Sequence, residues 1–190
     1  MKGTSMKRWI AILLAAALPG GVLADTYTVD KDHTYPSLEF PHMGISVWRG
    51  KFNRSAGKIT MDRTARTGSV QILTYIDSID FGHKAMNEVA MSDEWLNLGQ
   101  NPTMSYSGNL RFEGDKPVAV EGNLTLRGVT KPLTLKINRF NCITHPIFRR
   151  EVCGADAEGD LDRADYGMTQ FTADGMGKLH LRIQVEALKD

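Results

Sequence analysis

The strongest constraint on the fold is a strict alternation of apolar and polar residues near the C-terminus. In residues 178–187, KLHLRIQVEA, the apolar positions are Leu179, Leu181, Ile183, Val185 and Ala187. Successive side chains of a β-strand point to opposite faces of the sheet, so this segment predicts a strand with one dry and one solvated face. The same parity recurs in residues 118–126 and 133–137. The chain is therefore expected to build a sheet with one continuous apolar face.

Turn-forming residues separate these runs. Clusters of Gly, Pro and Asp stand at 113–117, 127–132 and 174–177, as is typical of the connections between antiparallel strands. Further strands are expected near 26–30, 36–43, 47–61, 69–77 and 103–112. About eight antiparallel strands with one apolar face form a sandwich or close into a barrel, and an eight-stranded barrel is wide enough for one small ligand. The alternation leaves open which of these forms, and whether the interior is packed or hollow.

One segment breaks the strand pattern. Within residues 83–98, Met86, Val89 and Ala90 recur at helical spacing. The residue before a proline avoids helical backbone, so Pro102 ends this segment. We therefore expect a short helical insert between two strands.

The N-terminus has the three parts of a secretory signal peptide. Residues 1–9 carry three basic residues and no acid, residues 10–18 are wholly apolar, and small or modest side chains precede Asp25. The apolar run is shorter than the roughly 20 residues of a transmembrane helix, although a short membrane anchor is the alternative. We expect residues 1–24 to be a signal peptide and residues 25–190 to be one periplasmic domain, with no stable membrane span after cleavage.

The charge balance excludes one class of partner. The chain has 23 Lys plus Arg against 22 Asp plus Glu; without the signal peptide the balance is 20 to 22, a formal charge of −2. No basic block remains, so nucleic acid is not an expected partner.

Two cysteines, Cys142 and Cys153, lie in the exported part of the chain. An oxidising compartment favours a disulfide between them. The alternative is a metal site that also uses His145, but no fourth ligand lies nearby in the sequence. We expect the disulfide, and no bound metal.

Five separated blocks resemble the YceI family. GNLTLRGVTKPLTL, residues 122–135, is similar to the signature segment of that family. The other blocks are DKDHTYPSLEFPHMG (30–44), SVWRGKFNRSAGKITMD (46–62), DSIDFG (77–82) and DRADYGM (162–168). The resemblance spans the exported domain, and the cysteine pair resembles one of its subgroups.

The resemblance implies a lipocalin-like, extended antiparallel β-barrel with an internal tunnel. It also implies a periplasmic or secreted protein that binds polyisoprenoids or other lipids, such as isoprenoid quinones, isoprenyl phosphates or fatty amides. In the family, the helical insert usually carries a His-containing pair, then two Phe, then Tyr-Pro. Here those positions read Val89-Ala90, Trp95-Leu96 and Asn101-Pro102. This departure bears on the identity of the ligand, because the insert is expected to cover one end of the tunnel.

A long isoprenoid chain needs an apolar tunnel more than it needs polar chemistry, because burial contributes about 0.8 kcal/mol per CH₂ group. For each candidate wall residue, ordinary core packing is the alternative role. The candidates are Phe40, His42, Met43, Val47, Trp48, Phe52, Ile72, Ile76, Trp95, Leu96, Met104 and Tyr106.

Three side chains are candidates for a ligand head group. His42 shares strand parity with Phe40, so it is proposed to face inward and meet the head group; the alternative is a histidine that fixes the first strands. Arg49 and Arg163 either hold a phosphate or pair with acids. The two acids beside Arg163, at positions 162 and 165, favour pairing.

The sequence lacks a Gly-x-Ser-x-Gly elbow, a phosphate loop and a dinucleotide fingerprint. We therefore expect a binding or carrier protein for an isoprenoid lipid, a quinone or a fatty amphiphile, with no cofactor and no catalytic role. One alternative is a stress-related interaction module with a packed interior. A second is an enzyme acting on such a lipid, with His42 as its acid or base. A homodimer also stays open.

Overall fold

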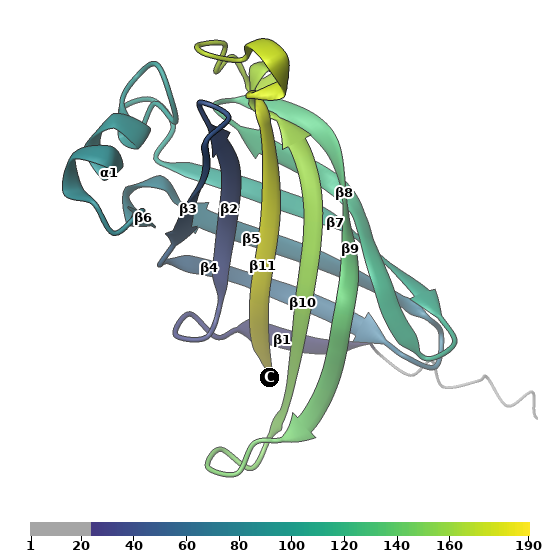
Figure 1. Ribbon diagram of the computed structural model, residues 1–190. Helices are drawn as coiled ribbons and strands as arrows, with labels where there is room; N and C mark the ends of the chain where they lie inside the picture. The colour runs from purple at the N-terminus through teal and green to yellow at the C-terminus, as the bar shows by residue number, and fades with distance from the viewer. Residues whose placement is uncertain (1–23) are drawn as a thin grey trace, which may run out of the picture.

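The computed structural model describes residues 24–190 as an all-β barrel (Figure 1). Eight antiparallel strands close in the order β1-β4-β5-β7-β8-β9-β10-β11, because β11 also pairs with β1. Their bounds are β1 Asp25–Val29, β4 Ser55–Asp62, β5 Thr67–Tyr75, β7 Thr103–Glu113, β8 Lys116–Leu126, β9 Val129–Thr144, β10 Glu151–Asp162 and β11 Lys178–Lys189. The predicted eight-stranded antiparallel barrel is confirmed. The predicted signal peptide lies, apart from Ala24, outside the described residues and stays a prediction.

The barrel closes because two different parts of β11 pair with two different strands on the same side. The C-terminal part of β11 pairs with β1, with Thr28 opposite Leu188. Its N-terminal part pairs with β2 (Tyr35–His42), which forms a hairpin with β3 (Ser46–Phe52), and β3 pairs with the short β6 (Ile79–Asp80). We call β2, β3 and β6 the flap, since they extend the wall at one end of the barrel.

Helical elements gather at the same end as the flap. Figure 1 shows the helix α1 beside β6 and the yellow segment before β11 at the upper end of the view. The elements are η1 (Ile76–Ser78), α1 (Lys84–Met91), η2 (Arg163–Tyr166) and η3 (Ala173–Gly175). Within residues 24–190, no helix is both long and apolar enough to cross a membrane.

The helix α1 is shorter than the predicted insert of residues 83–98. His83 caps its start, since the His83 Nδ1 accepts a hydrogen bond from the Met86 N–H at 3.2 Å. It ends at Met91, and the chain then folds into turns, one of them closed by the Leu96 N–H bonding to the Ala90 carbonyl. The prediction of a short helical insert is right, but its second half is turn.

Two β-bulges interrupt the alternation that the sequence predicts. In β8, Ala119 pairs with Arg111 and Pro117 pairs with Phe112, so Val118 between them is an extra residue without a partner in β7. As a result Pro117 and Val120 both line the interior, and Val118 does not. Placing Val118 on the dry face was therefore wrong. A matching bulge in β9, opposite the 156/157 step of β10, changes the parity of that strand in the same way.

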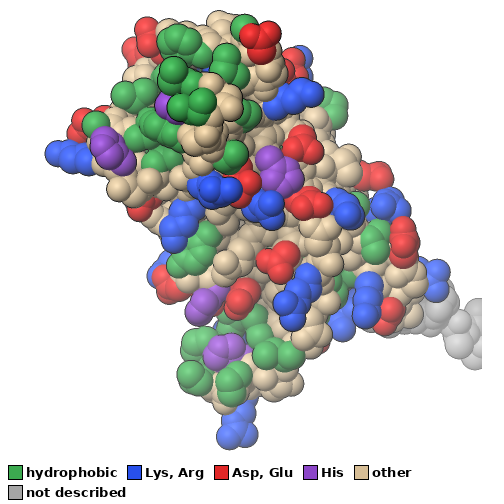
Figure 2. All heavy atoms as spheres, viewed as in Figure 1, with side chains coloured by type: hydrophobic (Ala, Val, Ile, Leu, Met, Phe, Trp, Pro, Cys, Tyr) green, Lys and Arg blue, Asp and Glu red, His purple; other side chains and the backbone are tan. Residues whose placement is uncertain are grey.

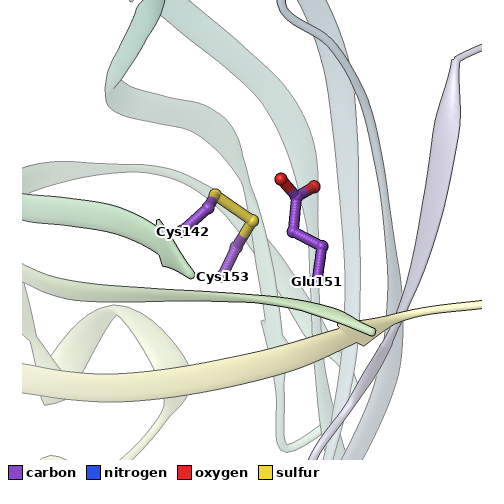
Figure 3. Close-up of side chains that lie close together, drawn as sticks. All are labelled: Cys142, Glu151 and Cys153. Carbon is purple, nitrogen blue, oxygen red and sulfur yellow. A yellow bond between two sulfur atoms is a disulfide. The ribbon is translucent and has the colours of Figure 1, made fainter. Parts of the chain in front are cut away.

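Cys142 of β9 and Cys153 of β10 face each other across the sheet and form a disulfide (Figure 3). The predicted disulfide is confirmed, and closing this hairpin contributes about 2–3 kcal/mol in the chain-entropy account. Glu151 lies beside the pair, with donor atoms within 4.8 Å of one another. His145 is occupied elsewhere, accepting N–H groups of its own hairpin loop, and the disulfide removes both sulfurs as thiolate ligands.

Glycines allow β7 and β8 to approach closely at the start of the signature segment. Gly122 stands opposite Gly108, and a Cβ at residue 122 would lie 2.9 Å from both the Gly108 Cα and a ring carbon of Tyr106. The Tyr106 ring is buried, and its hydroxyl lies 3.0 Å from the carbonyl oxygen of Val120 and 2.9 Å from that of Leu133. The absence of a side chain at Gly122 thus gives the Tyr106 ring the space in which its hydroxyl reaches these carbonyl oxygens.

We expect Gly122→Ala to destabilise the barrel by about 1–3 kcal/mol, because the added methyl group must displace backbone or the Tyr106 ring. The control is Gly154→Ala, whose Cβ would find its nearest atom, Glu186 Cγ, at an ordinary 3.5 Å. Urea unfolding midpoints measure both changes. Equal midpoints for the two variants would show that the close approach carries no strain.

Candidate functional site

The barrel interior holds an apolar cavity of about 210 Å³. Side chains from all eight barrel strands, the flap and α1 line it. Cys153 and Leu161 of β10 both belong to the lining, so at about 3.3 Å per residue the cavity follows roughly 26 Å of strand. Apolar cavities of comparable size stay free of water and bind apolar molecules. The interior is therefore an elongated apolar binding space.

Seven of the twelve residues proposed as tunnel walls line this cavity. They are Phe40, Phe52, Ile72, Trp95, Leu96, Met104 and Tyr106. That any of them contacts a ligand stays a prediction. The other five, which do not line it, are His42, Met43, Val47, Trp48 and Ile76.

Most of the five candidates that do not line the cavity lie at the tip of the flap. β2 pairs with β11 only as far as Glu39, so the tip of the hairpin, residues 41–48, extends past the part of β2 that is joined to the barrel. The His42 ring stacks on Trp48 with 4.4 Å between ring centres, and Met43 is 71% exposed. Strand parity predicted the side of the sheet for His42 but not that the barrel ends before it. Ile76 differs, because it is fully buried in the core packing around η1.

The space-filling view shows hydrophobic side chains gathered over the end where the flap and η3 lie (Figure 2). Large apolar side chains exposed in this part of the chain are Met43, Ile45, Val47, Val89 and Phe171. The end of the barrel covered by α1 is thus rimmed by apolar surface.

Much of the cavity wall consists of residues that the alternation places on the apolar face of the sheet but that are not among the twelve tunnel candidates. It comprises Leu124, Leu126, Leu133, Leu135, Ile137, Leu179, Leu181, Ile183, Val185 and Ala187. The alternation identifies these residues as apolar-face residues, and closure of the barrel then turns that face toward the cavity. The small residues Gly154, Ala155 and Ala157 of β10 also line the cavity. They lie in a strand that the sequence analysis did not name.

Arg163, in η2, lines the cavity and is 3% exposed. Its Nη1 donates to the Met168 carbonyl at 2.8 Å, and its Nη2 donates to the carbonyls of Gln170 and Phe171. The guanidinium carbon lies 4.6 Å from the centre of the Trp95 ring.

The expected pairing of Arg163 with its neighbouring acids is wrong. The Asp162 carboxylate instead caps η2 by accepting the Ala164 N–H at 2.9 Å. Arg49 does pair with an acid, because its Nε lies 3.0 Å from Glu39 Oε1 on the outer surface.

A hydrogen-bonded cluster closes the opposite end of the cavity. The Tyr27 hydroxyl donates to Glu151 Oε1 at 2.6 Å, and Arg63 Nη2 donates to Glu151 Oε2 at 2.7 Å. Burial and the bond to Glu151 raise the pKa of Tyr27 to about 12. Burial alone would raise the pKa of Glu151, but the bonds from Tyr27 and Arg63 outweigh it and lower that pKa below 4.5.

Because the folded-state pKa of Glu151 is lowered, its contribution to stability is complete above pH 4.5 and is lost as the pH falls through the folded value. We therefore expect the stability difference between the wild type and Glu151→Gln to be constant near neutral pH and to shrink below pH 4.5. Urea unfolding at a series of pH values measures it. Exposed Glu94, changed to Gln, is the control. A difference that stays unchanged down to pH 3 would contradict the cluster.

Comparison with known proteins agrees with this architecture. The family model for the YceI-like domain matches residues 27–187. A UPF0312 protein of Pseudomonas paraeruginosa is 29% identical over 189 residues, covering 96% of this chain and 98% of its own. The crystal structure of BcnA from Burkholderia cenocepacia is similar with a TM-score of 0.66 and 16% identity, over 83% of this chain and 98% of its own.

A second solved structure, described as a polyisoprenoid binding domain from Saccharophagus degradans implicated in plant cell wall breakdown, has a TM-score of 0.61 and 14% identity. The match covers 89% of this chain and all of that one. At these identities the solved structures establish the fold. Together with the family match over almost the whole described domain, they place this chain in the YceI-like domain family.

Proposed function

We propose that this protein is a periplasmic carrier that holds one long-chain isoprenoid lipid, quinone or similar amphiphile inside its barrel. The observation that carries the proposal is the elongated apolar cavity, lined from every strand of the barrel. Burying an apolar chain there contributes about 0.8 kcal/mol per CH₂ group without directional chemistry. The likeness to a polyisoprenoid binding domain supports this class of ligand.

The lining favours binding over catalysis. Among residues 24–190, no His, Asp, Glu or Lys side chain lines the cavity, and Cys153 is held in the disulfide. Tyr27 and Tyr106 do line it, but burial raises the pKa of both and their hydroxyls bond to Glu151 and to backbone carbonyls. General acid–base catalysis needs a titratable group within reach of the substrate. His42, the first suspect for an enzyme, lies outside the cavity. We therefore propose binding rather than catalysis as the role of this cavity.

The alternative of an interaction module has one observation in its favour, namely the exposed apolar side chains of the flap tip. That alternative also expects a packed interior, however, and this barrel is hollow. An apolar rim around one end of a lipid cavity equally suits a carrier, because the ligand must pass from an apolar surface into the barrel.

We expect Ala157→Trp to weaken ligand binding, because Ala157 lines the cavity midway along β10 and an indole ring there would occupy the space of the ligand chain. The matched control is Asp156→Trp, which places the same side chain at the neighbouring exposed position. Geranylgeraniol is the probe, in equilibrium titrations with purified protein, and thermal melts by circular dichroism show whether each variant is folded.

The wild type and Asp156→Trp should bind with similar affinity, and folded Ala157→Trp at least about tenfold more weakly, which corresponds to a loss of about 1.4 kcal/mol. Unweakened binding by folded Ala157→Trp would place the ligand outside the barrel. No binding by the wild type to geranylgeraniol or to a prenylated quinone would refute the carrier function.

A further inference from the structure

Arg163 is the only charged side chain among the described residues that line the cavity. The rest of the lining is apolar apart from a few hydroxyl groups, and the buried ones among these have partners, such as Thr74 with Ser55 and Tyr106 with backbone carbonyls. A cation buried to 97% at one end of such a cavity is a costly feature, since burying an ion without a counter-charge is strongly unfavourable.

The guanidinium has no counter-charge in contact with it, although the Asp162 carboxylate beside it in the chain acts on it at longer range. Arg163 bonds only to the neutral carbonyls of Met168, Gln170 and Phe171, and within residues 24–190 no carboxylate forms an ion pair with it. Its Nε is buried and has no hydrogen-bond partner in the protein. Burial lowers the pKa of Arg163 and the charge of Asp162 partly offsets this, but an arginine stays protonated at neutral pH.

A purely structural role accounts for only part of this arrangement. Bonds from Nη1 and Nη2 to three carbonyls fix the loop after η2, and the stack on Trp95 holds the plane of the guanidinium. Neither contact uses the Nε or brings a counter-charge into contact with the guanidinium. An oxyanion does both, because guanidinium groups bind phosphate and carboxylate through short, charge-assisted hydrogen bonds.

We infer that the cavity selects amphiphiles with an oxyanion head group, a phosphate or a carboxylate, which lies at Arg163 while the apolar tail extends toward Tyr27. The inference rests on the proposed carrier function and specifies the chemistry of its ligand. Trp95 and the turn segment of residues 92–102 cover the head-group end. The tail end is closed by the cluster of Tyr27, Glu151 and Arg63, in which Arg63 is already paired with Glu151 and so offers no free cation to an anionic head group.

Three ligands that share one chain test the inference: geranylgeranyl monophosphate, geranylgeranoic acid and geranylgeraniol. We expect the wild type to bind the phosphate and the acid at least about tenfold more tightly than the alcohol, which is the scale of hydrogen bonds to charged groups. The phosphate and the acid distinguish the two sources of the oxyanion. Isothermal titration with each ligand measures the ratios.

Arg163→Met removes the charge while keeping an apolar side chain of similar length, and the anion-to-alcohol ratio should fall to about 1 or below. Arg163→Lys keeps a cation but lacks the planar fork that holds the carbonyls, so the preference for anions should be largely retained. The control is Arg182→Met, which removes the same charge from the outer face of β11, where Arg182 pairs with Glu39. This control should leave every ratio unchanged.

Each outcome is decisive. Equal binding of the anions and the alcohol by the wild type overturns the head-group inference while leaving the carrier function intact. A preference for anions that survives in Arg163→Met overturns it as well. If Arg163→Met does not fold, the wild-type ratios and Arg163→Lys decide. Failure of all three ligands to bind the wild type overturns the carrier function itself.

Discussion

The pairing of β11 with β10 on one side and with both β1 and β2 on the other is the contact on which the architecture depends. It joins the first and last strands of the chain, so the sheet closes and its apolar face has no route to solvent except at the ends. Thr28 opposite Leu188, close to the C-terminus, belongs to this seam. Closing a sheet removes its exposed edges, and here closure also encloses the cavity.

The cavity inside the barrel depends on small residues in the wall as much as on closure of the sheet. Gly108 and Gly122 bring β7 and β8 together, and Gly159 lets β10 lie against Leu135 of β9. Ala155 and Ala157 then present small side chains inward where larger ones would fill the bore. Small side chains at these positions therefore leave space inside the barrel that larger ones would fill. A cavity bounded in this way gains little from a small ligand and more from a long one, since each buried methylene adds to binding.

The sequence predicted which faces of the barrel strands are apolar better than it predicted where the barrel ends. Alternation identified the dry faces of β8, β9 and β11, because burial on one side of a strand imposes a period of two. It did not reveal β10, whose GADAEGDLD sequence has weak strand propensity and is held by neighbours on both sides. Bulges also lie beyond local pattern, since an extra residue is defined only against its partner strand.

For the candidate site, too, the sequence predicted local features but not those set by tertiary structure. Parity assigned His42 to the inner face, but where the barrel stops is set by the length of the β2–β11 pairing, which is a tertiary property. Nearby acids suggested an ion pair for Arg163, yet the backbone turned Asp162 to cap η2 and left the guanidinium with carbonyls. Sequence proximity of opposite charges is weak evidence of contact, whereas burial of a charge inside an apolar cavity is strong evidence of a partner.

Whether the barrel carries one long apolar molecule is tested by native mass spectrometry of the protein purified from its own host, followed by organic extraction and lipid mass spectrometry of the same sample. We expect a single stoichiometric species with a long apolar chain, released on denaturation. A protein that is empty, and that stays empty when mixed with prenylated quinones and polyprenyl phosphates, would contradict this expectation.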